Sequence, residues 1–368
     1  MTLVYCIFGA SLFALIISRG SSFVSAESSV DSLDNTIYVK RSAFLFTVFW
    51  VIFSVLMGFR YNFVDTSTYK MMLRRIGTDF ANLLDPSVAK IEIGFNIWMI
   101  LCNIVSNSNE QFFVFVTTAV TLALVFTYLY RESTDGGFSI LLFITLYSFT
   151  FMNGIRQALA ASFFALAYQK YKDRPVIMVF VCVLLSVFHN SMLLLIPLYL
   201  CSRGGFFNWK IKLLYCFAVV VVVAPGSIDW ILNSVLSDRY IESLSIANYG
   251  VGRMRILINS LPVVLMLLAR RITKGQSIQS DDMDNLLLID FVVNLCSIRS
   301  TYFARMSIYF GLFLCAYYPA ILKKVFSKNS QGLAVALFTI FYTIFYFYQA
   351  YTFEQYGYLR EFYLIFMN

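Results

Sequence analysis

The sequence predicts an all-α fold, a polytopic bundle of membrane helices, and three observations support this class. Of the 368 residues, 60% are hydrophobic and only 13% are charged, and the mean hydropathy is +0.74, which is too apolar for a soluble globular domain. Apolar stretches of helical length recur along almost the whole chain. Ten-residue segments of alternating polarity, typical of outer-membrane barrels, are not seen. We therefore expect residues 1–368 to form a single integral membrane domain.

About 12 apolar segments are candidates for helices that span the membrane. In chain order they are residues 2–18, 43–59, 111–130, 138–152, 155–168, 175–188, 190–201, 211–224, 256–269, 286–298, 303–322 and 333–350. A further apolar segment, 93–105, would rise only about 20 Å as a helix, against a hydrocarbon core of about 30 Å. We expect this segment to be a short re-entrant or interfacial helix.

Clusters of lysine and arginine indicate the orientation of the bundle. They lie at 170–174, 203–212, 270–274 and 323–328, and the positive-inside rule places them in the cytoplasm. The alternation of spans then predicts that the polar breaks near Arg156 and His189, together with the loop 225–255 and residues 297–305, are extracytoplasmic. The loop 60–92 lies on the same face if 93–105 does not span the membrane and in the cytoplasm if it does. Charge bias does not choose between the two, and we assign 60–92 to the extracytoplasmic face because 93–105 is short. The net charge of +8 is explained by this orientation, so we expect no nucleic-acid partner.

Two polar breaks interrupt the apolar segments. The stretch "FMNGIRQALA" contains Arg156, and "FHNS" contains His189, the only histidine of the chain. A cation at mid-bilayer depth costs roughly 2.5–3.5 kcal/mol, so Arg156 is a functional candidate by default. The helices beside Arg156 have about 15 residues and rise only about 22 Å. We therefore expect Arg156 and His189 to line one cavity that opens to the extracytoplasmic face.

The candidate site collects the polar residues assigned to that face. A planar guanidinium suits a phosphate or pyrophosphate, and arginine dominates the set. His189, Asp65, Glu92 and Arg156 are the catalytic candidates, and the sequence leaves open which of the first three is the base. The candidates for substrate binding are Arg60, Tyr69, Gln157, Asn190, Tyr249, Arg253, Arg255 and Arg305.

Structural interpretations compete with these assignments. Arg156 could pair with a helix C-terminus, His189 and its neighbours could cap the next helix, and Arg253 and Arg255 could be interface anchors. The string "DDMD", Asp281–Asp284, mimics an Asp-x-Asp metal site, but it follows a basic cytoplasmic loop and is expected to be a solvated charge run. The sequence has no glycine-rich phosphate loop and no His/Cys cluster, so we expect no metal and no other cofactor.

Five motifs taken in order resemble the EpsG family of Wzy-type polysaccharide polymerases. They are the arginine before the Asp-x-x-x-Tyr of "FRYNFVDTSTY", the Glu-x-Gly-Phe of "EIGF", the Ile-Arg-Gln-x-x-Ala of "NGIRQALA", the Phe-His-x-Ser of "FHNS" and the Arg-x-Ser-x-Tyr-Phe of "ARMSIYF". The resemblance runs from about Arg60 to Phe310. It implies a GT-C-like fold in a bacterial inner membrane, with an active site that faces the periplasm or cell exterior.

The same resemblance implies a membrane glycosyltransferase that uses undecaprenyl-pyrophosphate-linked oligosaccharides as donor and acceptor. Its product would be a surface polysaccharide such as O-antigen, capsule or exopolysaccharide, and a chain-length regulator and a flippase would be further partners. Arginines could stabilise the pyrophosphate leaving group without a metal. Three other classes stay open: a flippase or transporter of lipid-linked sugars, an O-antigen-ligase-like enzyme, and an acyl-transferring membrane enzyme.

Overall fold

The structure of the protein is a computed structural model that describes residues 1–21, 43–89, 91–224, 253–299 and 301–367. Within these ranges the chain is helical, and the only β-pairing is an isolated antiparallel bridge between Arg60 and Leu364. The all-α prediction is confirmed for this part of the chain. The contacts divide it into two compact units.

Unit 1 consists of Met1–Leu193, Cys315–Ala320 and Lys328–Asn368. Its helices are α1 (Thr2–Ser21), α2 (Ala43–Gly58), α3 (Thr66–Ile76), η1 (Phe80–Leu84), α4 (Ile93–Ser106), α5 (Glu110–Glu132), α6 (Gly136–Asn153), α7 (Ile155–Tyr171), α8 (Pro175–Ser186), α17 (Lys328–Gln355) and η4 (Ile365–Met367). Another short helix, η2 (Asn190–Leu194), begins at its end.

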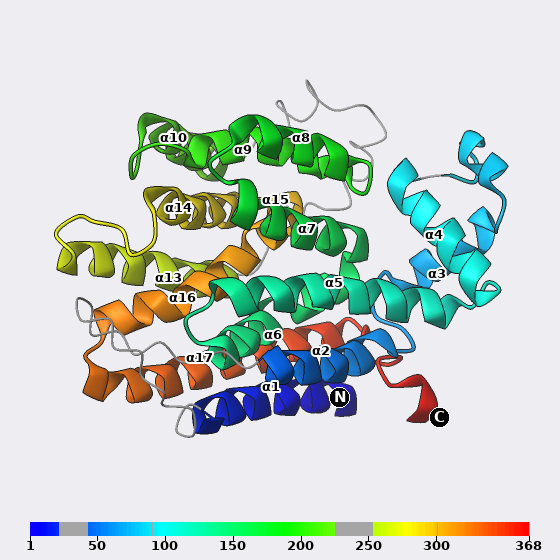
Figure 1. Ribbon diagram of the computed structural model, residues 1–368, viewed down its shortest axis with the longest axis horizontal. Coiled ribbons are helices and arrows are strands. Elements are labelled where there is room, and N and C mark those ends of the chain that lie inside the picture. The colour runs from blue at the N-terminus through cyan, green and yellow to red at the C-terminus, as the bar shows by residue number, and fades with distance from the viewer. Residues whose placement is uncertain (22–42, 90, 225–252, 300, 368) are drawn as a thin grey trace. The chain divides into compact units, whose positions relative to one another are not determined.

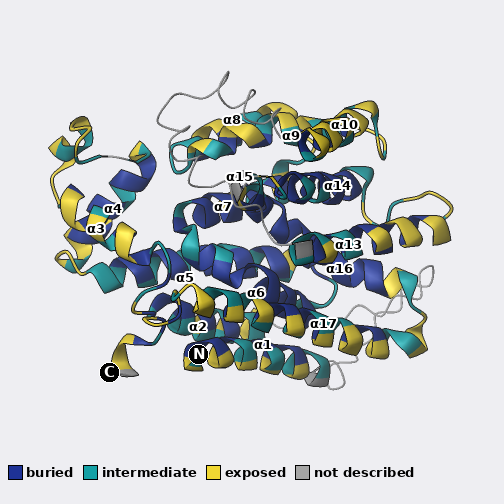
Figure 2. Cartoon of the chain, turned by 180° about the vertical axis from the view of Figure 1, so that it is seen from behind, coloured by how far each residue is buried: buried dark blue, intermediate teal, exposed yellow. Residues whose placement is uncertain are grey.

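Helix α6 is the centre of unit 1. It packs against α1, α5, α7 and α17, and it is dark blue, hence buried, along most of its length in Figure 2. The approach to α1 is close, because a Cβ added at Gly137 would lie 3.0 Å from the carbonyl oxygen of Ala14. Aromatic side chains fill the other side, where the rings of Phe149 and Tyr346 stack with centroids 5.0 Å apart. Burial on all sides explains why the sequence of α6 is apolar with no polar face.

The segment 60–92 forms structure of its own. Tyr69, Leu73 and Ile76 recur at helical spacing on α3, and they pack with Phe95 of α4 and Phe113 of α5 in one buried cluster. Figure 1 shows α3 and α4 beside the N-terminal end of α5. The sequence-based interpretation of 60–92 as a loop missed this helix, because α3 is short and strongly basic at its end.

Unit 2 consists of Leu194–Leu314 and Ile321–Ser327. Its helices are α9 (Leu195–Ser202), α10 (Trp209–Val223), α13 (Arg253–Ile272), α14 (Asp281–Cys296), α15 (Thr301–Met306) and η3 (Ser307–Tyr309), and α16 (Gly311–Val325) contributes to both units. Helix α14 is central, since α9, α10, α13 and α15 all pack against it. The hydroxyl of Ser280 caps α14 by accepting a hydrogen bond from the N–H of Met283.

Each apolar segment expected from the sequence coincides with helical residues, but the expected count of about 12 spans is not confirmed. Four described helices are long and apolar enough to cross a membrane, namely α1, α5, α6 and α17. A fifth span results if Phe303–Tyr309 and Gly311–Val325, which meet at a bend of 62°, count as one. Shorter apolar helices among the described residues are Ala43–Gly58, Ile93–Ser106, Pro175–Ser186 and Asn190–Ser202. Several apolar helices of this kind favour a membrane protein.

Candidate functional site

Three segments of unit 1 that are far apart in sequence meet at the carboxylate of Glu92. Glu92 immediately precedes α4, Arg156 lies in the first turn of α7, and Asn190 begins η2. Glu92 Oε2 forms a close ion pair with Nη1 of Arg156. Glu92 Oε1 accepts a hydrogen bond of 3.0 Å from the backbone N–H of Asn190. The structure thus brings together three of the residues that the sequence selected.

His189 approaches the same carboxylate. Its Nδ1 lies 3.3 Å from Glu92 Oε1, yet this buried nitrogen has no hydrogen-bond partner among the described residues. Distance and alignment together indicate an electrostatic contact, which strengthens when the imidazole carries a proton. The side chain of His189 keeps 22% of its surface exposed, so the imidazole is partly accessible from the surface.

Arg156 is held on its other side by Tyr69. The Nε of Arg156 donates a long hydrogen bond of 3.4 Å to the Tyr69 hydroxyl, and the guanidinium carbon lies 5.8 Å from the centre of the tyrosine ring. Tyr69 is itself buried and packs edge-on against Phe95, with centroids 6.0 Å apart. The guanidinium is therefore oriented by its neighbours, although 20% of the side chain stays exposed.

The surroundings of Glu92, which lies outside the predicted spans, keep it ionised. Burial by itself would raise its pKa, but the His189 imidazole, the Arg156 charge and the N–H of Asn190 outweigh burial and lower the pKa to about 2. Glu92 is therefore an anion at any physiological pH, and a poor proton acceptor.

A glycine makes this convergence possible. The N–H of Gly94 donates a 2.7 Å hydrogen bond to the carbonyl of Val187, and a Cβ at Gly94 would lie 2.7 Å from that same oxygen. Any other residue would clash there, so the close approach of the start of α4 to the end of α8 requires glycine. This contact brings Glu92 to His189 and Asn190, and the motif "EIGF" now has a structural reason.

Arg60 lies in a different environment. It is fully buried, and it donates to the carbonyls of Met57 and Met152 and to the hydroxyls of Thr66 and Thr118. Met57 and Met152 belong to the last turns of α2 and α6, so Arg60 joins two helix C-termini, where a cation is favourable. Its predicted contact with substrate stays a prediction.

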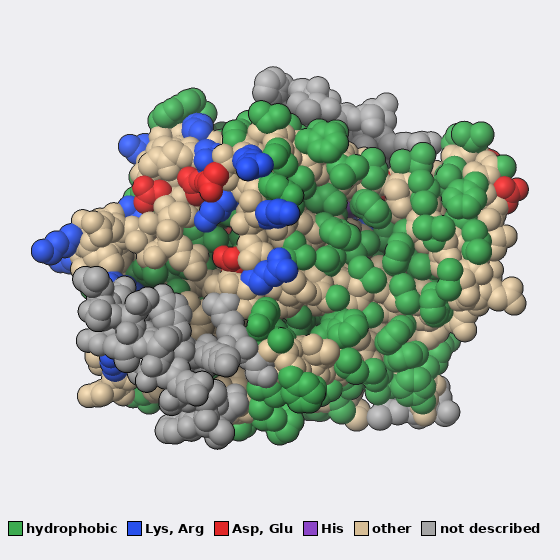
Figure 3. Space-filling model, viewed as in Figure 1, with side chains coloured by type: hydrophobic (Ala, Val, Ile, Leu, Met, Phe, Trp, Pro, Cys, Tyr) green, Lys and Arg blue, Asp and Glu red, His purple; other side chains and the backbone are tan. Residues whose placement is uncertain are grey.

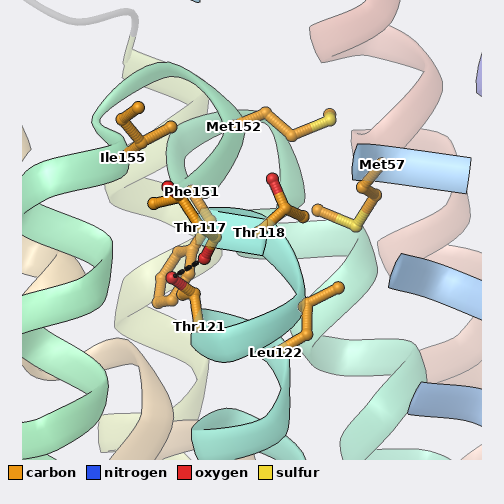
Figure 4. Close-up of a pocket in the computed structure, with 8 residues that line it drawn as sticks. All are labelled: Met57, Thr117, Thr118, Thr121, Leu122, Phe151, Met152 and Ile155. Atoms are coloured by element: carbon orange, nitrogen blue, oxygen red, sulfur yellow. Dashed lines mark hydrogen bonds between the residues drawn. The ribbon is translucent and has the colours of Figure 1, made fainter. Parts of the chain in front are cut away.

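A small cavity adjoins the Arg60 contacts. Its volume, about 10 Å³, is close to the minimum for one water molecule. Figure 4 shows its lining, which comes from α2, α5, α6 and α7: Met57, Thr117, Thr118, Thr121, Leu122, Phe151, Met152 and Ile155. A substrate does not fit there, so we do not regard this cavity as the functional site.

Two more candidate site residues, Asp65 and Gln157, belong to unit 1. Asp65 immediately precedes α3, and its backbone N–H donates to Oδ1 of Asn153 at 3.3 Å. Gln157 follows Arg156 and is buried. Asn153, which sequence reasoning did not select, thus joins the start of α3 to the end of α6. Its position in "NGIRQ", beside a helix break, was the available signal.

The remaining candidates belong to unit 2 or lie outside the described residues. Arg255 donates to the carbonyl of Ala304 at 3.1 Å and to the hydroxyl of Ser307 at 3.2 Å. Arg305 is exposed on α15. Arg253 begins α13, but its side chain is not among the described ones, and Tyr249 lies outside the described residues altogether. The assignment of Arg305 to the same candidate site as Arg156 stays a prediction.

The string "DDMD" forms an ion cluster in unit 2. Arg270 pairs with Asp281 at 2.8 Å and with Asp284 at 2.5 Å, and Arg203 pairs with Asp282 at 2.5 Å. Figure 3 shows basic and acidic side chains side by side at this end of the unit. Asp284 is fully buried, so the expectation of a solvated charge run is wrong for this residue. The pairing between helices explains why acidic residues begin α14.

Comparison with models of protein families identifies a match. The model of the EpsG family matches residues 43–362, a range that contains Glu92, Arg156 and His189. No curated protein and no solved structure matches the chain significantly.

Proposed function

The chain belongs to the EpsG family, and from this premise we propose that it polymerises lipid-linked oligosaccharide repeat units into a surface polysaccharide. The donor and the acceptor are undecaprenyl-pyrophosphate-linked oligosaccharides, and the reaction takes place at the extracytoplasmic face of a bacterial inner membrane. A flippase that delivers the units and a chain-length regulator are the expected partners. Membership of this family supports a polymerase-type function.

The observation that carries the proposal is the contact of Arg156, Glu92 and His189 at one place. A glycosyl transfer from a pyrophosphate needs a cation for the leaving group and a proton acceptor for the attacking hydroxyl. Arg156 supplies the cation, with 20% of its side chain exposed, and His189 lies beside it with 22% exposed. Glu92 links the two.

In the proposed reaction the hydroxyl oxygen of the acceptor sugar attacks the anomeric carbon of the donor glycan. A bond forms between these two atoms, the bond from the anomeric carbon to the phosphate oxygen breaks, and its electron pair leaves with the undecaprenyl pyrophosphate. The hydroxyl proton passes to a base. Arg156 stabilises the negative charge that develops on the leaving oxygen.

The surroundings of the candidates favour His189 as that base. The pKa of Glu92 is lowered to about 2, so its carboxylate accepts a proton poorly, and its two oxygens already contact Arg156 and Asn190. Imidazole groups exchange protons near neutral pH more readily than ionised carboxylates do. We therefore assign Glu92 to orienting His189 and Arg156. Asp65 stays the second candidate for the base.

The proposal is tested by returning Arg156→Ala and His189→Ala variants to a deletion strain and separating the surface glycan on a gel. A polymerase defect leaves single repeat units at the surface, with no ladder of longer chains. Unchanged long chains in Arg156→Ala would contradict the role of this residue. Loss of even the single unit would indicate a flippase or transporter, and chains of normal length that are not attached to their lipid core would indicate a ligase. Normal chains that lack an acyl group would indicate an acyl-transferring enzyme.

A further inference from the structure

Glu92 occupies the position that an anionic ligand of Arg156 would take. Its Oε2 contacts the guanidinium, its Oε1 accepts the N–H of Asn190 at 3.0 Å, and His189 Nδ1 is 3.3 Å away. One carboxylate thus faces a cation, a backbone donor and an imidazole. These are the groups that recognise a phosphate oxygen.

The geometry allows Arg156 to exchange this carboxylate for another anion. The Tyr69 hydroxyl holds Arg156 only by a long 3.4 Å bond, and the exposed fraction of the arginine side chain gives an incoming group access to it. Glu92 would keep the Asn190 N–H and His189 as partners if Arg156 turned away. Its buried charge would then still be compensated, which a charge with Arg156 as its single partner would not be.

We propose that Glu92 is an internal counter-ion, which holds Arg156 in the resting protein and is replaced by a phosphate group of the lipid-linked donor when the donor binds. This inference rests on the proposed function. It adds that the site binds its anion by exchange, so the measured affinity for pyrophosphate is weaker than the affinity of an unoccupied Arg156 would be. The released carboxylate keeps the N–H of Asn190 and His189 as partners, and it stabilises the charged imidazole that forms when His189 accepts the acceptor proton.

The proposal predicts that replacing Glu92 changes the affinity for pyrophosphate in a definite direction. Glu92→Gln keeps an acceptor for the N–H of Asn190 but removes the charge that competes for Arg156. We expect the dissociation constant for pyrophosphate to fall by about tenfold, since a charge-assisted hydrogen bond no longer has to be broken. A carboxylate that merely oriented Arg156 would give the opposite sign, because its loss would leave the guanidinium poorly placed.

The experiment measures binding of inorganic pyrophosphate and of undecaprenyl pyrophosphate to the purified full-length protein in nanodiscs. The matched control is Glu110→Gln, which removes a carboxylate from the same unit that pairs with Arg74 at 2.8 Å and touches none of the site residues described above. We expect no tightening in this control. The double variant Glu92→Gln/Arg156→Gln should lose the gain, because the exchange takes place at Arg156.

Each outcome decides the matter. If Glu92→Gln, but not the control, binds both inorganic pyrophosphate and undecaprenyl pyrophosphate more tightly, exchange at the phosphate group is supported. If Glu92→Gln binds only undecaprenyl pyrophosphate more tightly, exchange that also needs the lipid is supported. Equal tightening in Glu110→Gln, or unchanged or weaker binding in Glu92→Gln, overturns the counter-ion. If Glu92→Gln does not fold, Glu92→Asp provides the test, since its shorter side chain withdraws from Arg156 while it keeps its charge. Binding that is lost in Arg156→Gln but not improved in either Glu92 variant would overturn this inference and leave the proposed function intact.

Discussion

Two arginine-carboxylate clusters of the molecule differ in the balance of their charges. In unit 2, Arg203 and Arg270 face the three carboxylates Asp281, Asp282 and Asp284, and Arg270 also stacks on Phe206 at 3.8 Å. In unit 1, Arg156 faces the single carboxylate of Glu92, which it shares with His189 and the N–H of Asn190.

Under the proposed function, this difference separates a structural cluster from one that takes part in the reaction. Carboxylates outnumber cations in the unit 2 cluster, so the charge of Arg270 is neutralised within the protein and does not attract a further anion. In unit 1 one carboxylate serves several donors, and protonation of His189 would leave the cluster with excess positive charge. A buried ion pair is by itself weak evidence for function, but the ratio of charges indicates which pair can accept a ligand.

The largest effect is expected for Arg270→Gln. It removes the guanidinium that pairs with Asp284 at 2.5 Å. Because Asp284 is fully buried, breaking this pair costs about 3–5 kcal/mol. The free energy of unfolding, or the melting temperature in detergent, measures the loss. The variant Arg270→Gln/Asp284→Asn should recover much of it. A stable Arg270→Gln protein would contradict the structural role of the unit 2 cluster.

Arg156→Gln should act on the reaction instead. We expect the rate of polymerisation to fall by about 100- to 1000-fold, the range seen when one group that stabilises transition-state charge is removed. The melting temperature should change much less than in Arg270→Gln, because Glu92 keeps two other partners. The measurement is chain extension by purified protein with synthetic lipid-linked units. Similar rates of polymerisation in the Arg156 and Arg270 variants would contradict the distinction between the two clusters.

The pH dependence of stability should show the bond network of Glu92. The folded pKa of about 2 lies below the ordinary value of 4.5, so the ionised carboxylate stabilises the fold above pH 4.5, and this contribution disappears as the pH falls from about 4.5 towards 2. We expect the free energy of unfolding of the wild type to exceed that of Glu92→Gln by about 1.5–3 kcal/mol near pH 6. The difference should shrink steadily in acid, as thermal unfolding from pH 6 to pH 3 would show. A difference that does not vary with pH would contradict the lowered pKa.

Gly94→Ala should push the start of α4 away from the end of α8. Its Cβ would meet the Val187 carbonyl at 2.7 Å, and overpacking of this kind costs about 1–3 kcal/mol. Glu92 would move with α4, so polymerisation should fall even where the protein stays folded. Gly205→Ala is the matched control, since a Cβ there has nothing within 4 Å. Equal effects of the two substitutions would show that the close approach does not position the site.

The smallest effect is expected for Tyr69→Phe. It removes the long hydrogen bond from Arg156 but keeps the ring that the guanidinium faces. A bond of this kind contributes about 0.5–1.5 kcal/mol, so polymerisation should slow by no more than about tenfold. Kinetics of chain extension measure it. A loss as large as that of Arg156→Gln would mean that Tyr69, and not Glu92, determines the position of the guanidinium.

Much of the fold could be predicted from the sequence. Apolar segments marked the helices, and the polar breaks "NGIRQ" and "FHNS" indicated which residues would meet, because a charge inside an apolar run needs a partner. The sequence could not show that Glu92 would be that partner. The contact depends on the 2.7 Å approach of Gly94 to Val187, and such tertiary packing leaves no periodic pattern.

Arg60 illustrates the opposite limit. Its residue type and its place after an apolar helix resemble those of Arg156, but its burial and its four described acceptors are properties of the folded chain. The same holds for Asp284. Its sequence position predicts an exposed acidic residue, but in the folded chain it is buried where α13 and α14 pack together. Charge identity is visible in a sequence, whereas the acceptor that each charge finds is decided by packing.

The order of the site residues along the chain has a consequence for how the protein is made. Glu92 precedes Arg156 by 64 residues and Asn190 by 98. During synthesis Glu92 is therefore made first, Arg156 second and Asn190 last, so the contact with Asn190 is the last of the three whose residues become available.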